Sequence, residues 1–574
     1  MTAGPFIPFK GFTPSVDPTT PGAILNCTNM VPTIRGMKAA ASPVPFGNPA
    51  FVAPVTGAAS CELLSGSYRT FAGTATDLYE VASNANNNVS VVAGSYTGGT
   101  NPWRFVQFGN ATIATNGADS LQQSVGSGKF LPIGSVNSIK IGNGGAGFTS
   151  APTVAIAPPA SGQGIAATAV ATISGGAVSN ITVTDNGEGY GYNEVPSVTI
   201  SGGGGSGAAA TAVMQSAPIA KIVEATQGFV FALNTTDPIN GSRPHGWACC
   251  GLYDQTDWLA SQATQSASGI IVDQPGQITA GKALGTNIIV YKATSMFYGV
   301  YDGPPVIWAF NQISPEIGTP CQECVVGVTS VQYFLGTDKQ VYVFDGNVPQ
   351  PIGDEVHEWL ANTWSTAHQQ NVQSYYDETN SLIYWYFASV NNQSGAIDTC
   401  LVFNHRTGKF GRADMTIQAA VQAISGQITW TGMGSLPGVT TWSTLPQVPY
   451  DSAYWAQSVP SQGVVDSTNT LQSLNGTAGD SSITTGWLGD DYNYTDYLGF
   501  IPRFSQQPAS CTGSADTISQ LGTQSMPTQW TIGPYYDGEL AADFSARYCQ
   551  VQLSFNGNHE LLGCTLRLGQ SGEI

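Results

Sequence analysis

Apolar and polar residues alternate along most of this chain, in short runs that are separated by turn residues. In the segment 221–235, KIVEATQGFVFALNT, apolar side chains recur at every second position on both sides of Gln227-Gly228. The same pattern surrounds Thr337-Asp338 and Arg406-Thr407-Gly408. A period of two residues with polar turns is typical of strands joined in hairpins. The pattern therefore predicts an all-β chain.

One segment has the spacing of a helix instead. In GDEVHEWLANTWSTAHQQ, residues 353–370, acidic residues occupy the first turn, where they complement the helix dipole. The residues that share one face are Val356, Trp359, Leu360 and Thr363. The spacing predicts a helix over 353–370.

The predicted strands fall into groups that match the size of β-propeller blades. Four or five short strands follow Cys61 within about sixty residues, which is close to one blade. The same pattern resumes near Ala217. We therefore expect a β-propeller built by two separated stretches of chain.

The segment between these stretches repeats itself. ATAV occurs at 167–170 and again at 210–213, and PTV at 152–154 corresponds to PSV at 196–198. These copies are rich in Gly and Ala and carry almost no charge. The pattern predicts a Gly/Ala-rich β-repeat module that is inserted in a propeller loop.

The two ends of the chain differ from this middle part. Nine prolines before Phe51 exclude a long helix and indicate an extended arm. Near the other end, the turn 556–558 lies between two alternating strands, which favours a β-sandwich or strands added to the main sheet. The predicted organisation is an N-terminal arm (1–60), the first part of the propeller (61–137), the inserted module (138–216), the remainder of the propeller (217–436) and a C-terminal β-sandwich-like region (437–574).

The composition is poor in charge and strongly acidic. Only 10% of the residues are charged, against about a quarter in ordinary soluble domains, while the chain has 68 Gly and 34 Pro. Lys and Arg number 18 against 37 Asp and Glu, which gives a net charge of −19. Such a chain is poor in the cationic side chains that bind phosphates. It can still surround DNA, because a wall that repels the backbone lets DNA slide without sticking.

The sequence shows no targeting or membrane segment. No cationic region precedes an apolar stretch at the start, and no run of about 18 apolar residues occurs, so we expect neither a signal peptide nor a transmembrane helix. The ten cysteines are scattered along the chain. They indicate a reducing compartment with free and mostly buried thiols.

Two cysteine pairs are candidates for metal or redox chemistry. Cys321 and Cys324 form a CxxC, but a metal site of this kind needs a second pair, and redox use favours a pair that opens a helix. The strand residues VVGV follow instead, and no histidine or other cysteine has matching spacing. We interpret this pair, and the vicinal Cys249-Cys250, as buried thiols.

Two glycine motifs match a dinucleotide-binding pattern only by spacing. Both spell GxGxxG, at 142–147 and at 202–207. A dinucleotide site needs this loop to open a helix whose N-terminus faces the pyrophosphate. Prolines follow the first motif and exclude a helix there. The second motif lies in the second copy of the same repeat, so we expect no helix after it either. We interpret both motifs as turns.

Glycosidase propellers are a real alternative among enzymes. They need paired carboxylates, and sialidases also carry Ser-x-Asp-x-Gly-x-Thr-Trp turns and an arginine cluster. The chain has no such turn, its arginines are spread from Arg35 to Arg567, and neither GxSxG nor HExxH occurs. The acidic pairs Asp490-Asp491 and Asp354-Glu355 suit solvated positions. We predict no catalytic residues, no cofactor and no metal site, and we expect no enzyme.

Several stretches resemble the tail hub or nozzle family of short-tailed bacteriophages (podoviruses), which are also described as packaged-DNA stabilisation proteins. They follow one another along the chain in the family's order and cover about half of it. The stretches are TPGAILNCTNMVPTIRGMK (20–38), the Asp-x-x-Asp-Trp turn within Gly251 to Trp258, the Ile-Ser-x-Glu-x-Gly … Phe-Leu … Asp-Gly block from Ile313 to Gly346, YYDETNSLIYWYF (375–387) with LVFNHRTGKF (401–410), and SARYCQVQLSF (545–555). The inserted module departs from the family's pattern.

This resemblance implies a structural virion protein of the viral tail, made in the host cytoplasm. It implies a homohexamer ring below the portal and the adaptor, or head-to-tail connector. The ring would form the lower part of the DNA-ejection channel and retain the packaged genome. Viral double-stranded DNA would pass through its lumen without specific binding. A tail needle or tip protein and tail fibres or tailspikes are the further partners. The alternative is a carbohydrate-binding or carbohydrate-degrading propeller protein of the phage tail.

Overall fold

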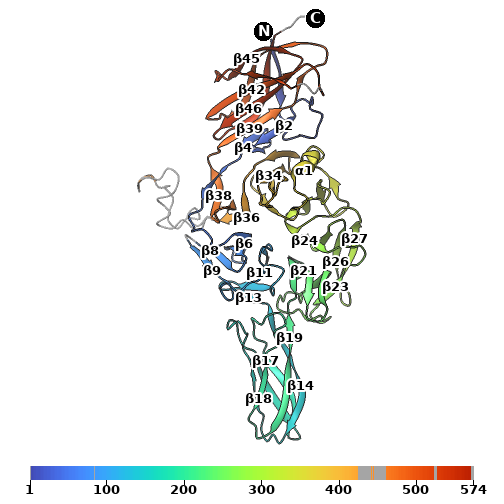
Figure 1. Ribbon diagram of the computed structural model, residues 1–574. Coiled ribbons are helices and arrows are strands. Elements are labelled where there is room, and N and C mark those ends of the chain that lie inside the picture. Colours follow the sequence, from blue (N-terminus) through green and yellow to red (C-terminus); the bar gives the residue numbers. More distant parts are fainter. Residues whose placement is uncertain are drawn as a thin grey trace.

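Strands form nearly all of the regular structure. The computed structural model describes residues 2–82, 85–424, 441, 444, 460–522 and 526–569. Within these residues, the two elements that are not strands are the helix α1 (His357–Thr363) and the 3-10 turn η1 (Gln322–Cys324). The predicted all-β class is confirmed. A C-terminal sandwich, a propeller and the inserted module follow one another along the molecule (Figure 1).

The middle part is a β-propeller with seven four-stranded antiparallel blades. Blade 1 contains β6 (Val55–Glu62), β7 (Tyr68–Thr74), β8 (Leu78–Ala82) and β9 (Ala85–Asn88). Blade 2 contains β10 (Arg104–Phe108), β11 (Ala111–Thr115), β12 (Gln122–Val125) and β13 (Leu131–Pro132). Blade 3 contains β20 (Ile219–Thr226), β21 (Phe229–Asp237), β22 (Gly241–Cys249) and β23 (Ala267–Ile270). Blade 4 contains β24 (Ile278–Leu284), β25 (Asn287–Lys292), β26 (Met296–Gly303) and β27 (Ile307–Ser314).

The remaining three blades complete the ring. Blade 5 contains β28 (Val325–Val328), β29 (Val331–Leu335), β30 (Val341–Phe344) and β31 (Gln350–Pro351). Blade 6 contains β32 (Val372–Asp377), β33 (Leu382–Phe387), β34 (Thr399–Asn404) and β35 (Lys409–Arg412). Blade 7 contains β36 (Ile417–Ile424), β37 (Pro460–Asp466), β38 (Leu471–Gly476) and β5 (Ser42–Pro45). The first strand of each blade contacts the first strand of the next, and β36 closes the ring on β6.

The second strands of the blades explain the apolar runs in the sequence. Strand β33, LIYWYF, is buried at every position, and the first seven residues of β21 are buried as well. A strand that is covered on both faces needs apolar side chains on both, so it loses the alternation of a half-exposed strand. The predicted turns at Gln227-Gly228, Thr337-Asp338 and Arg406-Thr407-Gly408 lie between paired strands and are confirmed.

Blade 7 places the domain boundaries differently from the expected ones. The boundary expected at residue 436 falls inside this blade, because β37 and β38 pair with β36. The outermost strand of the blade, β5, comes from the segment 1–60 that was expected to be an extended arm, and β6 begins blade 1 at Val55. One blade thus joins two distant parts of the chain, as the strand pairing requires to close the ring.

The inserted module is a duplicated β-unit that leaves the propeller between blades 2 and 3 (Figure 1). Its first copy contains β14 (Gly134–Ala146), β15 (Thr153–Ile156) and β16 (Thr168–Ser174). Its second copy contains β17 (Ala177–Asp185), β18 (Val198–Ser201) and β19 (Ser206–Ser216). Strands of one copy pair with strands of the other: β14 with β19, β16 with β17, and β15 with β18. The two copies are therefore intertwined and share one core.

The C-terminal part is a sandwich of two antiparallel sheets. One sheet contains β47 (Glu560–Gly569), β41 (Thr495–Gln506), β45 (Glu539–Ala546) and β44 (Tyr535–Tyr536). The other contains β39 (Asp480–Thr485), β46 (Tyr548–Asn556), β42 (Ser510–Ile518) and β43 (Thr528–Thr531), with β40 (Leu488–Gly489) beside β46. Strands β46 and β47 flank the predicted turn at 556–558 but lie in different sheets, so this turn joins the two layers.

The N-terminal arm connects the sandwich with the propeller. Strand β1 (Thr2–Pro8) pairs with β47, and β2 (Ile24–Thr28) pairs with β39 in the opposite sheet. Strand β3 (Met30–Pro32) pairs with β35 of blade 6, while β4 (Met37–Ala39) pairs with β47. Both structures that the sequence left open are present: a sandwich forms, and one of its sheets continues into blade 6.

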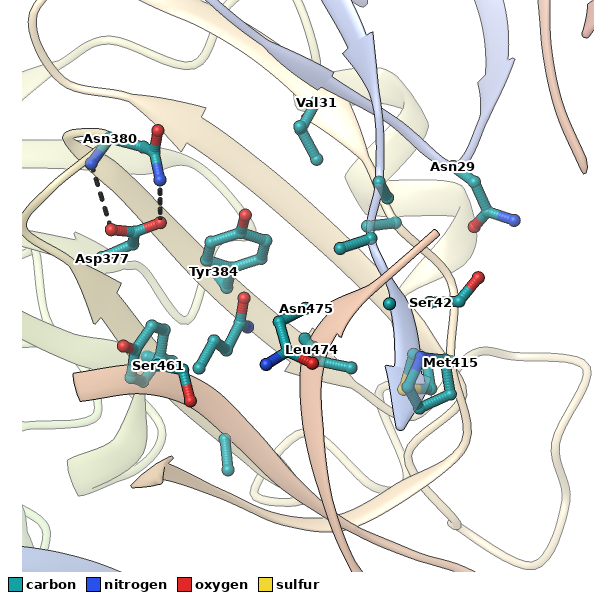
Figure 2. Close-up of a pocket in the computed structure, with 18 of the residues that line it drawn as sticks. Asn29, Val31, Ser42, Asp377, Asn380, Tyr384, Met415, Ser461, Leu474 and Asn475 are labelled. Carbon is teal, nitrogen blue, oxygen red and sulfur yellow. Dashed lines mark hydrogen bonds between the residues drawn. The ribbon is translucent and has the colours of Figure 1, made fainter. Parts of the chain in front are cut away.

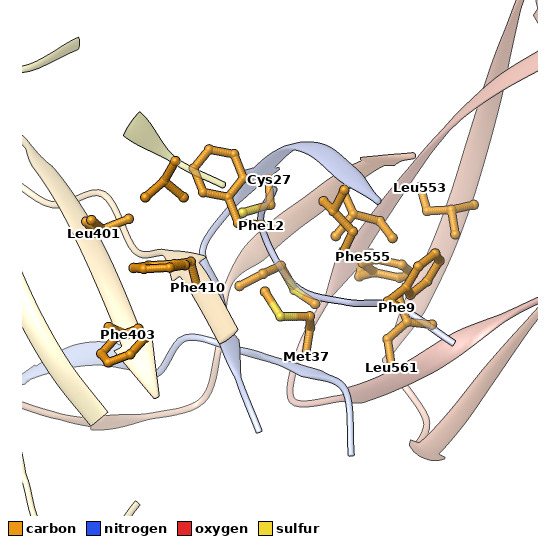
Figure 3. Packing of buried hydrophobic residues seen from close by; sticks show 14 of the residues in the cluster. Phe9, Phe12, Cys27, Met37, Leu401, Phe403, Phe410, Leu553, Phe555 and Leu561 are labelled. Carbon is orange, nitrogen blue, oxygen red and sulfur yellow. The ribbon is translucent and has the colours of Figure 1, made fainter. Parts of the chain in front are cut away.

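A single hydrophobic core runs across this junction (Figure 3). Phe9, Phe12 and Met37 of the arm pack in one cluster with Phe410 of blade 6 and Phe555 of the sandwich. Each of these five side chains is at most 3% exposed. The propeller and the sandwich are thus packed through the arm without an intervening solvent layer.

The helix is shorter than predicted. It spans His357–Thr363 rather than 353–370, since Trp364 adopts an extended conformation and forms a bridge with Ser389 of blade 6. Its predicted inner face is confirmed in part, because Val356 and Leu360 are fully buried. Tertiary pairing with the blade therefore ends the helix after two turns.

Candidate functional site

A large cleft lies where the propeller, the arm and the sandwich meet. Its volume is about 1180 Å³. The first strands of three consecutive blades, β32, β36 and β6, contribute residues to its wall. The opposite wall comes from the arm, around Asn29 to Pro43, and from the sandwich, at Gln506 and 558–560. The cleft is therefore bordered by the propeller, the arm and the sandwich, and Figure 2 shows residues of its lining.

Three tyrosines of blade 6 form an aromatic row along this cleft. Tyr384 and Tyr386 project from the same face of β33, because side chains two residues apart in a strand point the same way. Their rings are stacked, with centroids 6.2 Å apart and planes at 10°. Tyr375, the cross-strand partner of Tyr384, extends the row with a centroid distance of 6.3 Å. The hydroxyl of Tyr384 points into the cleft (Figure 2).

These phenols are neutral groups. Burial raises the pKa of Tyr375, Tyr384 and Tyr386 above the ordinary value of a tyrosine. Tyr386 accepts a hydrogen bond of 2.7 Å from Nε2 of Gln462 in blade 7. The row can therefore donate and accept hydrogen bonds, but it presents no phenolate as a base or a nucleophile.

The carboxylates at the rim of the cleft are largely held by their own neighbours. Asp377 accepts from the backbone N–H of Asn380 at 3.0 Å and from its Nδ2 at 2.7 Å. Glu560 accepts from Oγ1 of Thr33 at 2.7 Å and from Ser505. Partial burial opposes ionisation of Glu560, but the hydrogen bonds from Ser505 and Thr33 keep its pKa below its ordinary value.

A second polar cluster crosses the centre of the propeller. Arg104 in blade 2 forms a bidentate ion pair with Glu323 of η1, at 2.7 Å and 2.9 Å. Its third contact is a 2.7 Å hydrogen bond to the carbonyl of Lys221 in blade 3. Gln322 also bonds the backbone N–H and C=O of Gly281 in blade 4. The turn η1 thus fastens blades 2, 3 and 4 to the start of blade 5 at the axis.

All ten cysteines are free and buried. The sulfurs of Cys321 and Cys324 lie 3.3 Å apart, and the hydrogen bond between them, together with burial, raises the pKa of Cys321 well above its usual range. Cys249 lies in the core between blades 3 and 4, whereas Cys250 faces the core between blades 2 and 3. Burial raises the pKa of Cys250 to about 12. These are protonated core thiols, as the sequence suggested.

The other sequence candidates do not converge on either cluster. Within the first glycine motif, Gly142 and Gly144 lie on β14, and the second motif falls in the turn that leads into β19. Asp490 caps its own turn by accepting from the N–H groups of Tyr492 and Asn493. Asp491 accepts a hydrogen bond from the hydroxyl of Tyr548 in the sandwich. Asp354-Glu355 precedes α1, where Asp354 accepts from Gln340.

Sequence reasoning missed the tyrosine row and the axial ion pair. The spacing Tyr-x-Tyr at 384–386 indicates one face of a strand, but not that this face borders a cleft. Arg104 and Glu323 are 219 positions apart, so no local pattern links them.

The described residues lack two features that would point to particular functions. Among them, no group of three or more His, Cys, Asp or Glu side chains is placed to hold a metal ion. In the same part of the chain, no helix has the length and apolar character needed to cross a membrane.

Comparisons with known proteins find only distant structural similarity. No family model matches the chain, and no curated protein matches it. The computationally designed Ika8 protein is 11% identical, with a TM-score of 0.32 over 74% of this chain and 97% of that chain. YCF48 from Cyanidioschyzon merolae is 10% identical, with a TM-score of 0.25 over 63% of this chain and 95% of that chain. An exo-beta-1,3-galactanase from Phanerochaete chrysosporium is 8% identical, with a TM-score of 0.21 over 60% of this chain and 94% of that chain. At these TM-scores the similarities carry no argument, and the propeller assignment rests on the strand pairing.

Proposed function

We propose that this chain is a structural subunit of a bacteriophage tail, the hub or nozzle that surrounds the path of DNA out of the virion. The observation that carries the proposal is the continuous core that joins the propeller to the sandwich (Figure 3). The arm pairs with both sandwich sheets and with blades 6 and 7. Relative movement of the domains would break these backbone ladders. A rigid body of this kind suits a part that bears load in an assembly.

The stretches that resemble the hub family lie at joints of the fold. Segment 20–38 supplies the arm strands β2, β3 and β4. The turn 251–258 contacts blade 2, where Gln255 donates to Gln123 at 3.3 Å and Trp258 packs on the core around Ile113. The block 313–346 contains Glu323 of the axial ion pair. The resemblance therefore falls on residues that fix the arrangement of blades and domains.

The charge distribution fits a wall that DNA passes without sticking. The net charge is −19. At least five of the 18 basic side chains are already in ion pairs with carboxylates: Arg69, Arg104, Lys282, Arg412 and Arg567. Acidic side chains outnumber basic ones 37 to 18, so the chain has a net excess of negative charge and is poor in the cations that displace counterions from phosphates, which is the main source of nucleic-acid affinity. Repulsion of the backbone then favours sliding.

The oligomeric state and the activity of the purified full chain test this proposal. We expect a ring of six copies by sedimentation and negative-stain microscopy, with no hydrolysis of host polysaccharide. We further expect the ring to bind the adaptor at one end and a needle or tip protein at the other, with fibres or tailspikes at its side. Trimers that depolymerise polysaccharide would contradict the structural role and favour a tail enzyme.

A further inference from the structure

We infer that the cleft between the propeller and the sandwich is a binding site for neutral oligosaccharides. This inference rests on the geometry of the cleft and is independent of the structural role proposed above. Three features carry it: a preformed shape, an aromatic row with one partly exposed ring, and polar groups that have no partner among the described residues.

The shape of the cleft is fixed by the fold. Its walls belong to the propeller, the arm and the sandwich, and these parts share one packed core and one continuous sheet. Ligand sites are mostly preformed concavities at domain junctions, with volumes of about 300–1,000 Å³. At about 1180 Å³, the cleft has room for several sugar rings in a row.

The tyrosine row supplies the apolar part of such a site. Tyr384 and Tyr386 are 8% and 1% exposed and form the packed base of the row, whereas Tyr375 on the adjacent strand is partly exposed and is the ring that a ligand can reach. A pyranose has one face of C–H bonds and a rim of hydroxyl groups. Its C–H face suits an aromatic ring, which has a large apolar area and a negative π-face.

Polar side chains around the row are available for the hydroxyl rim. The hydroxyls of Tyr375 and Tyr384 have no hydrogen-bond partner among the described residues. The same holds within that part of the chain for the side-chain amides of Gln422 and Asn475. Amides offer both donors and acceptors, which matches hydroxyl groups that need both.

The charges of the cleft select against an anionic ligand. Among the described residues, Lys38 is the one Lys or Arg side chain in its lining, against Asp377, Glu378, Asp414 and Glu560. Asp414 is paired with Arg412 at 2.7 Å, and Asp377 and Glu560 are held by hydrogen bonds. The surface offered to a ligand is therefore mainly uncharged and polar, with a net excess of acid. Nucleic acids and acidic glycans would be repelled.

An array of defined oligosaccharides tests the inference on the full chain. We expect retention of neutral glucans or related neutral glycans and no retention of anionic ones such as hyaluronan fragments. The best neutral glycan is then titrated against Tyr384→Ala and Asn475→Ala. Each variant should bind at least tenfold more weakly. Asn475→Ala is the safer variant because this side chain is exposed and unpartnered within the described residues.

A matched control and an accessibility measurement complete the test. Tyr536→Ala removes a tyrosine that is 82% exposed on the sandwich, outside the cleft, and should leave affinity unchanged. The inference is overturned if no neutral glycan is retained, or if Asn475→Ala and Tyr536→Ala bind alike. It is also overturned if Asn475→Cys resists maleimide in the native full chain, since the cleft is then covered and closed to a ligand. The ten native cysteines are buried, so labelling reports the new thiol.

Discussion

Trp359 is the side chain whose removal best tests how the arm is held on the propeller. Its indole lies edge-on to Phe12 of the arm, with centroids 5.1 Å apart and planes at 86°. It also contacts Phe387 of blade 6 at 6.1 Å, and the guanidinium of Arg412 lies 5.5 Å from its ring. The residue therefore links the arm, the helix and blade 6. Trp359→Ala should loosen all three.

The magnitude follows from these contacts. Truncation of a buried Phe or Trp to Ala costs about 3–5 kcal/mol. Two aromatic pairs contribute about 0.5–1.5 kcal/mol each beyond area burial, and an exposed cation–π contact about 0.5–1 kcal/mol. Because Trp359 is partly exposed, we expect the lower end, about 3 kcal/mol. Trp359→Phe keeps an aromatic ring and should cost clearly less.

Thermal melts and sedimentation of both variants measure this effect. We expect Trp359→Ala to melt at a lower temperature as an isolated subunit, and to expose the arm to limited proteolysis. The reasoning is refuted if the isolated subunit keeps its melting temperature while ring assembly fails. That result would place the indole at a contact between subunits rather than inside one chain.

Four further outcomes follow from the structure. Deleting 134–216 and joining Ile133 to Ala217 through a short Gly-Ser turn should leave the melting and circular dichroism of the remainder nearly unchanged. The two ends are already close, because the N–H of Ala217 donates to the carbonyl of Ile133 at 2.9 Å. Loss of folding would show that the module belongs to the core. Glu323→Ala should destabilise the propeller by about 3 kcal/mol, the lower end of the cost of removing one partner of a buried ion pair, because the two side chains are 15% and 14% exposed. A melt equal to wild type would contradict a closed axis. Burial lowers the pKa of His559 below 6.5, so the stability that this residue contributes is complete above pH 6.5 and is lost as pH falls through the lowered pKa. His559→Asn should therefore flatten the dependence of Tm on pH between about 7 and 5. An unchanged slope would show that other groups cause the acid sensitivity. The unmodified chain should not bind duplex DNA even at low salt, where cationic proteins gain orders of magnitude in affinity. Tight, salt-sensitive binding in a mobility-shift assay would contradict a channel surface that repels DNA.

The candidate site depended on contacts that no local pattern reports. The tyrosines at 375, 384 and 386 were visible as strand residues, and their alternation placed two of them on one face. The space in front of them exists only because the sandwich and the arm stop short of the propeller at this point. The axial pair of Arg104 and Glu323 likewise needed the ring to close before the two side chains could meet.

The sequence by itself determined the all-β class, most of the hairpin turns, the duplicated insertion and the burial of the thiols. These features depend on periods of two residues, on turn residues and on composition, which act over a few positions. Only the tertiary structure decided that seven blades close into a ring and that residues 42–45 complete the last one. In the sequence, Pro43 and Pro45 argue against regular secondary structure at this point. An outermost strand nevertheless tolerates proline, because the N–H groups on its open side need no partner. Ring closure and the joining of the domains depend on pairing between strands far apart in the chain, and that pairing is set by burial of the whole fold rather than by any segment.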